Sequence, residues 1–457
     1  MASEEMGPAR SSRWSAMGRA FANRNYRLFF LGQGVSLVGT WMTRLATGWL
    51  ILRLAGADAP WLLGVASFAG LAPTFFLGPI AGVFVDRWDR RRVLVVTQVL
   101  AMFQSAALAW VAFSGPSGPL AIALVVALSV AQGAINAFDM PARQSMMVEM
   151  VARREDLPNA IALNSSLVNG ARLVGPATAG VVIAAVGEAW CFAIDAVSYA
   201  AVVAALLAMR LTPRPRAAAV GSVGRRLVEG FRYAFGFPPI RALLLLLALI
   251  SFAAMPQSVL MPVFAARVLG GGPSTLGLLS AAQGLGALAG ALYLASRVSV
   301  LGLGRVIVAA AGVLGMGLIG FSQSGSVWLS AALLTATGAG MMVQMAASNT
   351  LIQTMVDEDK RGRVMGFYGM AFQGVAPFGS LLGGWLAGLV GPRPVVFGSG
   401  LLVLAGGAAF ASQLPRLRRH ARPVYARLGI IPVAADAAAP VAVRPPSPRE
   451  MGEPVGP

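Results

Sequence analysis

Long uncharged apolar stretches dominate this chain, and short polar or charged segments separate them. Most stretches reach the roughly 20 residues that a helix needs to cross a bilayer, and they lack the roughly ten-residue alternating segments of a membrane β-barrel. We predict twelve membrane-spanning helices, at 28–53, 62–85, 93–114, 119–139, 159–186, 189–209, 242–266, 274–296, 306–322, 327–349, 364–391 and 394–414. The fold class that this pattern predicts is an all-α membrane protein.

The composition supports a membrane protein and excludes several other classes. Hydrophobic residues make up 57% of the chain and charged residues only 12%, whereas about a quarter of the residues of a soluble domain are charged. The chain has a net charge of +18 but no basic face interleaved with aromatic residues. We therefore do not expect nucleic acid as a partner, and we expect membrane lipid instead. With one cysteine, Cys191, and one histidine, His420, we expect no disulfide, metal site or cofactor.

The basic residues predict how the chain lies in the membrane. If the helices alternate in direction, 31 of the 36 Lys and Arg residues fall on one side and three on the other. Basic residues favour the cytoplasmic side of a membrane. We therefore expect a multi-pass protein of the bacterial inner membrane with both termini in the cytoplasm. The first 26 residues lack the apolar core of a cleaved signal peptide.

A polar segment at the midpoint divides the predicted helices into two groups of six, which we expect to form two pseudo-symmetric bundles. Within it, Leu227, Val228, Phe231 and Phe235 share one face of a predicted amphipathic helix, which is typical of a helix lying on a membrane surface. The expected parts are a cytoplasmic N-terminal segment, a first bundle, a linker, a second bundle and a disordered tail, at 1–27, 28–209, 210–241, 242–414 and 415–457.

The two halves repeat one pattern. Residues 150–180 and 355–384 each begin with Met-Val, continue through a charged loop and enter a helix rich in Gly and Pro. Two homologous bundles predict a substrate path at their interface, near the middle of the membrane, that opens alternately to each side.

Two motifs resemble those of a known family. The stretch GVFVDRWDRRR at 82–92 is similar to the Gly-x-x-x-Asp-Arg-x-Gly-Arg-Arg signature of major facilitator superfamily transporters, through Gly82, Asp86, Arg87, Arg90 and Arg91. The fifth predicted helix resembles the Gly-x-x-x-Gly-Pro-x-x-Gly-Gly motif of the exporter branch, through Gly175, Pro176 and Gly180. Residues 39–54 and 139–176 resemble the subfamily of the enterobactin exporter and macrolide efflux proteins.

The first motif is expected to form a gate. A glycine at Gly82 permits close approach of another helix, for which we expect the helix at 364–391. The resemblance implies that Asp86 contacts the start of that helix and that Arg90 pairs with an acid low in the fourth helix, for which Asp139 is the candidate. The alternative is an anchor to the inner leaflet, which accounts for Arg91 but not for Asp86. Asp89 replaces the glycine of the signature and has no assigned role.

The second motif has two interpretations. Proline removes a backbone hydrogen bond and small residues permit a bend and close packing where two bundles meet. The resemblance associates such a helix with exporters that exchange protons for substrate. Generic helix packing is the alternative, because glycine is frequent throughout this chain.

Charges inside membrane helices are expensive and mark candidate functional residues. Arg172 lies near the middle of its helix, where it could contact an anionic substrate or hold neighbouring amides. Arg44 and Asp195 have similar predicted depths, so we expect a pair between the first and sixth helices. Asp195 is then either a proton carrier or one half of a static ion pair.

These features predict a secondary active transporter that exports an amphipathic small molecule, such as a siderophore, drug or related metabolite, as a monomer. Protons are the expected coupling ion, in antiport. An importer or lysolipid flippase of the same fold is an alternative. A membrane enzyme or sensor is a remote one, because no nucleophile, base or metal ligands cluster in the sequence.

Overall fold

The structure is a computed structural model that describes residues 19–115, 118–151, 153–210, 223–297 and 299–431. Its described residues form helices and turns, with no strand among them. Ten helical stretches in this part of the chain are long and apolar enough to cross a membrane, and the first, Arg24–Gly78, contains one whole helix and most of the next. The predicted all-α membrane fold is confirmed.

The first half contains six long helices, preceded by the short turn η1 (Arg19–Ala22). They are α2 (Arg24–Ala55), α3 (Ala59–Arg87), α4 (Arg90–Ser114), α5 (Pro119–Met150), α6 (Leu157–Val186) and α7 (Glu188–Ala208), with the short turns η2 (Gly56–Asp58) and η3 (Arg154–Asp156). Prolines in the first turn of α3, α5 and α6 suit those positions, because the first turn of a helix has no backbone acceptor for their missing N–H.

The second half repeats this arrangement. Its helices are α9 (Pro238–Val263) with the π-helical turn η4 (Phe264–Val268), α10 (Pro273–Ala295), α11 (Leu303–Gln323), α12 (Val327–Met355), α13 (Arg361–Gly369), η5 (Met370–Gly374), α14 (Ala376–Val390) and α15 (Pro392–Arg427). The helix predicted at 364–391 is therefore interrupted by the π-helical turn η5, which ends three residues before Pro377, a residue that cannot donate a backbone hydrogen bond.

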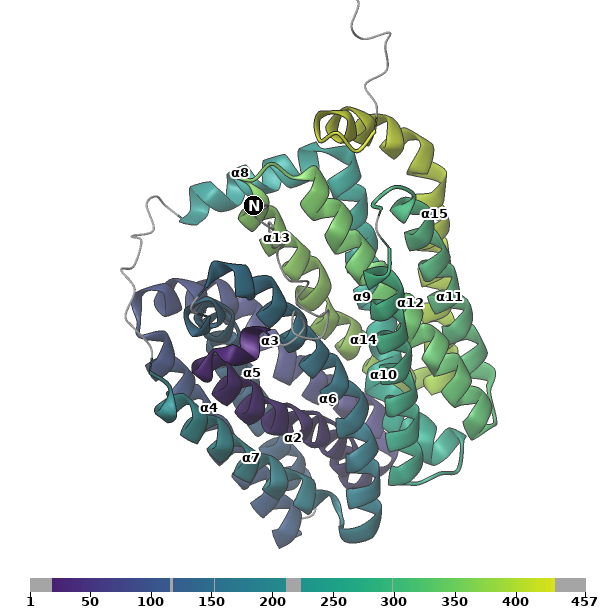
Figure 1. Cartoon of the computed structure of the whole chain (residues 1–457). Helices are drawn as coiled ribbons and strands as arrows, with labels where there is room; N and C mark the ends of the chain where they lie inside the picture. Colours follow the sequence, from purple (N-terminus) through teal and green to yellow (C-terminus); the bar gives the residue numbers. More distant parts are fainter. Residues whose placement is uncertain (1–18, 116–117, 152, 211–222, 298, 432–457) are drawn as a thin grey trace, which may run out of the picture.

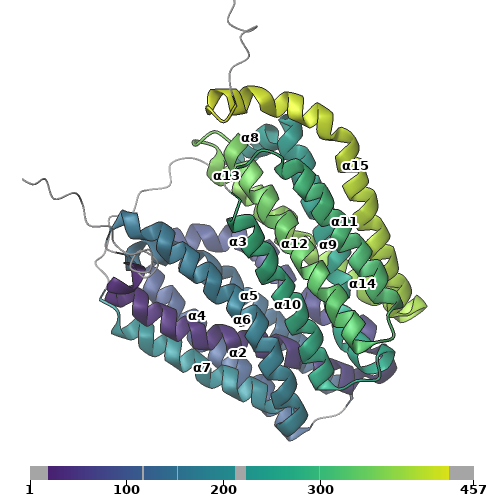
Figure 2. The same ribbon diagram turned by 45° about the vertical axis from the view of Figure 1, so that its right-hand side comes forward.

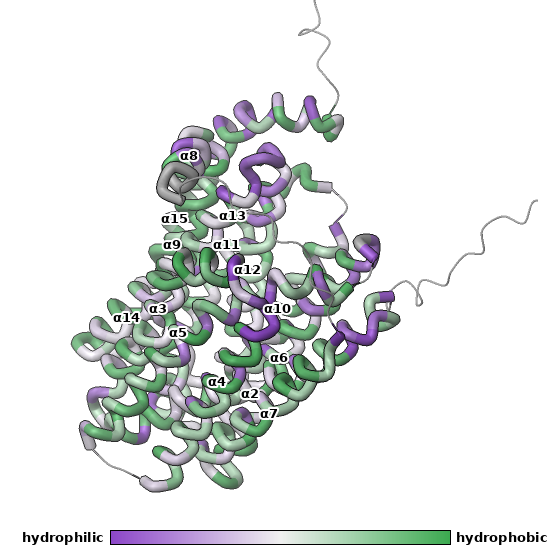
Figure 3. Tube along the Cα trace, turned by 90° about the vertical axis from the view of Figure 1, so that its left-hand side faces the viewer, coloured by the Kyte–Doolittle hydropathy of each residue, from purple (hydrophilic) through white to green (hydrophobic). Residues whose placement is uncertain are grey.

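The two halves lie side by side at an angle (Figures 1 and 2). They meet along two helix pairs, α3 with α14 and α6 with α10. We call the end of the molecule that carries α8 (Val223–Gly236) the α8 end, and the opposite end the far end. The halves converge toward the far end and separate toward the α8 end. Along the bundles most residues are hydrophobic, while hydrophilic residues gather near helix ends, including α8 and α13 (Figure 3).

Helix α8 lies across the α8 end and is fixed to α13. Glu229 pairs with Arg363 of α13 at 3.1 Å, and the Phe231 ring lies edge to face with the ring of Phe367 of α13, with their centroids 6.0 Å apart. Burial raises the pKa of the Tyr233 phenol, which donates a hydrogen bond to Asp357 Oδ2 at 3.1 Å. Of the predicted apolar face, Phe231 is exposed, while the side chain of Leu227 lies outside the described residues.

The C-terminal expectation needs a correction. We predicted disorder from residue 415, but α15 continues without interruption to Arg427. Leu417 and Ala421, one helical turn apart, are buried, so the extension is held by packing. Residues 432–457, the rest of the predicted tail, lie outside the described residues.

Candidate functional site: the interface between the two halves

Small residues close the interface toward the far end. A Cβ added to Gly180 of α6 would lie 2.8 Å from the Cα of Gly277 of α10, and one added to Gly64 of α3 would lie 3.0 Å from the Cα of Gly384 of α14. Cβ atoms essentially never lie closer than 3.0 Å to another heavy atom, so a larger residue at these positions would push the helices apart. Beside the second contact, Ser67 donates a hydrogen bond to Ser380 at 3.0 Å.

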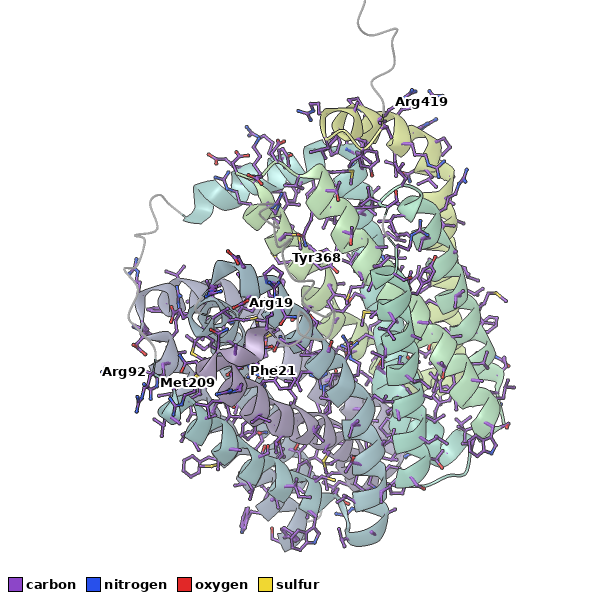
Figure 4. The ribbon with its side chains drawn as sticks, in the orientation of Figure 1. Arg19, Phe21, Arg92, Met209, Tyr368 and Arg419 are labelled. Carbon is purple, nitrogen blue, oxygen red and sulfur yellow. The ribbon has the colours of Figure 1, made fainter. Side chains whose placement is uncertain are left out.

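The same helices are open toward the α8 end. A Cβ added to Gly78 or Gly82 of α3, or to Gly366 or Gly369 of α13, would meet no described atom within 4 Å. The expected close packing of Gly82 against the helix at 364–391 is therefore absent in this conformation. Figure 4 shows Tyr368 of α13 on the second half, and Arg92 and Met209 at the edge of the first half. The interface is closed at the far end and open at the α8 end.

The charged stretch at 86–92 is divided between several partners. Asp89 caps the N-terminus of α4, because its Oδ1 accepts a hydrogen bond from the backbone N–H of Arg92 at 2.8 Å. Arg91 donates to the carbonyl of Leu207 at 2.6 Å. Arg87 is exposed in the last turn of α3. The side chain of Asp86 lies outside the described part of the chain.

The expected pair of Arg90 and Asp139 is wrong for this conformation. Arg90 instead pairs with Glu149, at 2.5 Å, one helix away on α5. Asp139 pairs with Arg143 of its own helix and accepts hydrogen bonds from two side chains of α4, Thr97 at 3.0 Å and Gln98 at 2.7 Å. The prediction placed the acidic partner of Arg90 on the correct helix, α5, but at Asp139, ten residues before the observed partner Glu149.

The exporter motif on α6 packs against both halves. A Cβ on Gly175 would lie 2.5 Å from the Cβ of Trp41 of α2, and one on Gly277 would lie 2.8 Å from the carbonyl oxygen of Pro176. With the contact at Gly180, the three motif residues thus face α2 in the first half and α10 in the second. In this conformation the motif forms part of the contact between the halves.

The predicted pair of Arg44 and Asp195 is also wrong. Arg44 lies over the Trp41 ring, with its Cζ 4.9 Å from the ring centroid, and Arg172 of α6 lies over the same ring at 5.3 Å. Sequence reasoning missed Trp41, which joins the two arginines. An aromatic residue one turn from a membrane arginine is the signal that could have found it.

Asp195 is held by hydroxyl groups from three helices. Thr43 of α2 and Ser105 of α4 donate to Oδ2 at 2.8 and 2.9 Å, and Ser198 of α7 lies 3.4 Å from Oδ1. A Cβ on Gly39 would lie 2.6 Å from Oδ1, so this glycine makes room for the carboxyl. The side chain is fully buried. Hydroxyls can donate or accept, so they can satisfy either protonation state of the carboxyl.

A separate, partly open apolar pocket of about 70 Å³ lies in the second half, between α9, α11, α12 and α15. Its lining includes Leu351, Phe410 and Tyr425. Because all its lining residues belong to the second half, this pocket is not part of the interface between the halves.

Comparisons with known proteins agree with this architecture. The "Staphyloferrin A transporter" of Staphylococcus aureus (strain NCTC 8325 / PS 47) is 23% identical over 360 residues, 78% of this chain and 88% of that protein. The "Multidrug efflux pump Tap" of Mycolicibacterium fortuitum is 27% identical over 388 residues, 83% of this chain and 93% of that protein. The "Macrolide efflux protein A" of Streptococcus pyogenes is 24% identical over 396 residues, 83% and 94% of the two chains.

Solved structures with the same fold include a bacterial homologue of the human lysosomal transporter Spinster, in an inward-facing and unoccupied conformation. It has a TM-score of 0.66 and 13% identity, over 91% of this chain and 99% of that chain. A bacterial homologue of the iron transporter ferroportin, in an inward-facing state, has a TM-score of 0.66 and 17% identity, over 85% and 98%. The profile of the family described as transmembrane secretion effector matches residues 15–429. The chain is therefore a member of the transmembrane secretion effector family, within the major facilitator superfamily.

Proposed function

We propose that this protein is a secondary active transporter that exports an amphipathic small molecule by alternating access. The observation that carries the proposal is the asymmetric interface, closed at the far end by Gly180 against Gly277 and open at the α8 end around Gly82. Two bundles that rock about a central site would close one end as the other opens. The described conformation is then one of the two end states.

The basic residues support placing the α8 end in the cytoplasm, so that the conformation is inward-facing. In this proposal the protein is a monomer in the bacterial inner membrane, surrounded by lipid, with both termini cytoplasmic. The curated relatives' names, a siderophore transporter, a multidrug efflux pump and a macrolide efflux protein, support export of a siderophore, drug or related metabolite.

The gate of the proposed cycle lies at the α8 end. When the bundles rock to the outward-open state, the open face of α3 at Gly78 and Gly82 would close against α13. The start of α13 is a helix N-terminus, which favours a carboxylate such as Asp86. The pair of Arg90 with Glu149 fixes the start of α4 to α5, so that this end of the first half moves as a unit.

Proton antiport is the coupling that the buried acids support. Among the acids that the structure describes within the long helices, Asp139, Glu149 and Glu188 each pair with an arginine, and Asp195 does not. Asp195 also lies beside Thr43, which directly precedes Arg44. We propose that Asp195 carries the coupling proton.

The test uses proteoliposomes with an acidic lumen and radiolabelled erythromycin or staphyloferrin A outside, with the uptake of protein-free liposomes subtracted, because a weak base such as erythromycin enters an acidic lumen unaided. An antiporter accumulates substrate in the acidic compartment, whereas a proton-coupled importer accumulates it in the alkaline one. Asp195→Asn is expected to abolish gradient-driven accumulation and to retain exchange of labelled for unlabelled substrate. Substrate transport that does not depend on the pH gradient would contradict antiport. Transport of lysophospholipid but not of the other substrates would support the flippase alternative.

A further inference from the structure

Arg44 and Arg172 share one aromatic ring, and neither has an acidic partner. Their guanidinium carbons lie 4.9 and 5.3 Å from the Trp41 centroid, so they are no farther apart than the sum of these distances. Among the described residues, no ion pair or side-chain hydrogen bond reaches either guanidinium. The Nε–H of Arg172 is buried and has no acceptor in this part of the chain. Two like charges thus meet at one ring, and no described acid pairs with either of them.

The pair lies where the two halves meet. Gly48 is one turn beyond Arg44 on the same face of α2, and a Cβ there would lie 3.1 Å from Cγ of Pro262 in α9 of the other half. The backbone carbonyl of Arg172 would lie 2.9 Å from a Cβ on Gly284 of α10. Arg44 is nevertheless exposed. Its guanidinium therefore borders the space between the halves, next to the contacts that close the far end.

The second half presents amides on the helices that face this pair. Gln283, the residue before Gly284, donates a hydrogen bond to the side-chain oxygen of Gln257 at 2.9 Å. No described acid on α9 or α10 offsets the two arginines, because the spans of both helices contain no Asp or Glu.

The chemistry of these groups selects a ligand. A buried donor without an acceptor, such as the Nε–H of Arg172, is unfavourable, and an arginine stays protonated in a protein. A guanidinium offers a planar fork of donors that matches a carboxylate or phosphate. The ring of Trp41 offers an apolar face beside the fork. An anion with an apolar part would satisfy the Nε–H of Arg172, neutralise charge and cover the ring at once.

We propose that Arg44, Arg172 and Trp41 form a binding site for the anionic group of an amphipathic substrate. This inference rests on the proposed transport function, whose substrate it restricts to organic anions. An anionic lysophospholipid carries the same chemistry as a soluble organic anion, and the experiment separates these two sources.

The test measures binding to the purified full-length protein in neutral detergent by titration calorimetry, with empty micelles subtracted. The probes are tetraphenylborate and tetraphenylphosphonium, which have similar size and shape, opposite charge and no hydrogen-bonding group, so they test the recognition of charge alone. The protein should bind tetraphenylborate at least tenfold more tightly than tetraphenylphosphonium. Arg44→Gln with Arg172→Gln should abolish this preference, and Arg44→Lys with Arg172→Lys should retain it.

The matched control is Arg241→Gln with Arg305→Gln, which removes the same charge from exposed positions and should bind both probes as the parent does. Equal affinity of the parent for the two probes overturns the proposal, as does unchanged tetraphenylborate affinity in the double glutamine variant. If that variant fails to fold, the single variants Arg44→Gln and Arg172→Gln and the anion preference of the parent test the proposal instead. Competition by lysophosphatidylglycerol assigns the anion to a lipid head group, and its absence assigns it to a soluble molecule.

Binding is measured without a membrane or gradient, so its outcome is independent of the transport test. If the protein transports erythromycin or staphyloferrin A but shows no preference for the anionic probe in the binding measurement, this inference is overturned and the transport function stands. If the protein prefers the anionic probe but shows no gradient-driven transport, the transport function is overturned and the anion site stands.

Discussion

Gly180→Ala is expected to destabilise the inward-facing state specifically. The added methyl group would lie 2.8 Å from the Cα of Gly277 and 2.9 Å from the carbonyl oxygen of Pro273, both backbone atoms that cannot rotate away. Overpacking of this kind costs about 1–3 kcal/mol. If the cost falls on the state in which the far end is closed, the population of that state relative to the outward-open state falls roughly 5- to 150-fold, since about 1.4 kcal/mol is a factor of ten.

Gly170→Ala is the matched control. It lies on the same helix, and an added Cβ meets no described atom within 4 Å. Both changes gain the same helix propensity, about 1 kcal/mol, so the difference between them reports the contact alone.

The assay is the rate of disulfide formation between Ser67→Cys and Ser380→Cys, whose hydroxyls lie 3.0 Å apart at the closed end. The parent's one cysteine, Cys191, is buried and gives the baseline. We expect Gly180→Ala to slow cross-linking, by at most the factor by which the ratio of the two states falls, and Gly170→Ala to leave it unchanged. Equal rates for the two alanine variants would refute the assignment of Gly180 to the closed gate.

Further predictions concern the α8 end and the buried acid. A Cβ added to Gly82 meets no described atom within 4 Å in this conformation, so Gly82→Leu should preserve cross-linking at the far end while blocking closure against α13, which transport measurements would detect as a loss of turnover. Asp89→Ala removes the cap of α4 and should cost about 1 kcal/mol of stability, whereas Asp89→Asn, an equally good cap, should cost little; unfolding in denaturing detergent measures both. A double-mutant cycle between Arg90 and Glu149 should give a coupling of about 0.5–3 kcal/mol, and one between Arg90 and Asp139 should give almost none in the inward-facing state. Ser105→Ala removes a hydrogen bond to the Asp195 carboxyl and should lower the free energy of unfolding by about 1.5–3 kcal/mol if the carboxyl is ionised; no change in the melting temperature would contradict the assigned contact.

The sequence predicted the membrane helices well because bilayer thickness imposes their length and apolar character. The predicted spans at 306–322 and 327–349 place the break between α11 and α12 within one residue of the observed one, because α11 ends at Gln323 and α12 begins at Val327. Helix ends beyond the apolar core were harder. Residues 140–150 of α5 and 415–427 of α15 have the mixed composition of loops, yet packing keeps them helical.

Side-chain partners could not be predicted, because depth is readable from the sequence and rotation about the helix axis is not. Arg44 was expected to meet Asp195 from its depth, but its neighbour Thr43 makes that contact. One residue turns a helix by 100°, which moves Arg44 onto the face that carries Trp41. The error at Arg90 has another cause: the predicted span ended at residue 139, whereas α5 continues to Met150 and carries the observed partner, Glu149, in that extension.

The role of Asp89, in contrast, could have been predicted from the sequence. An aspartate directly before a run of helical residues is a favoured N-cap, and the structure places it there. The family's glycine is thus replaced by a residue that stabilises the start of α4. This role is separate from the proposed gate.

Alternating access is tested most directly by measuring transport before and after oxidation of the Ser67→Cys and Ser380→Cys pair in proteoliposomes. The disulfide would hold the far end closed. Oxidation should stop gradient-driven transport, leave tetraphenylborate binding from the α8 end intact, and be reversed by reductant. Undiminished transport by the fully cross-linked protein would contradict a mechanism in which the two halves separate at this contact.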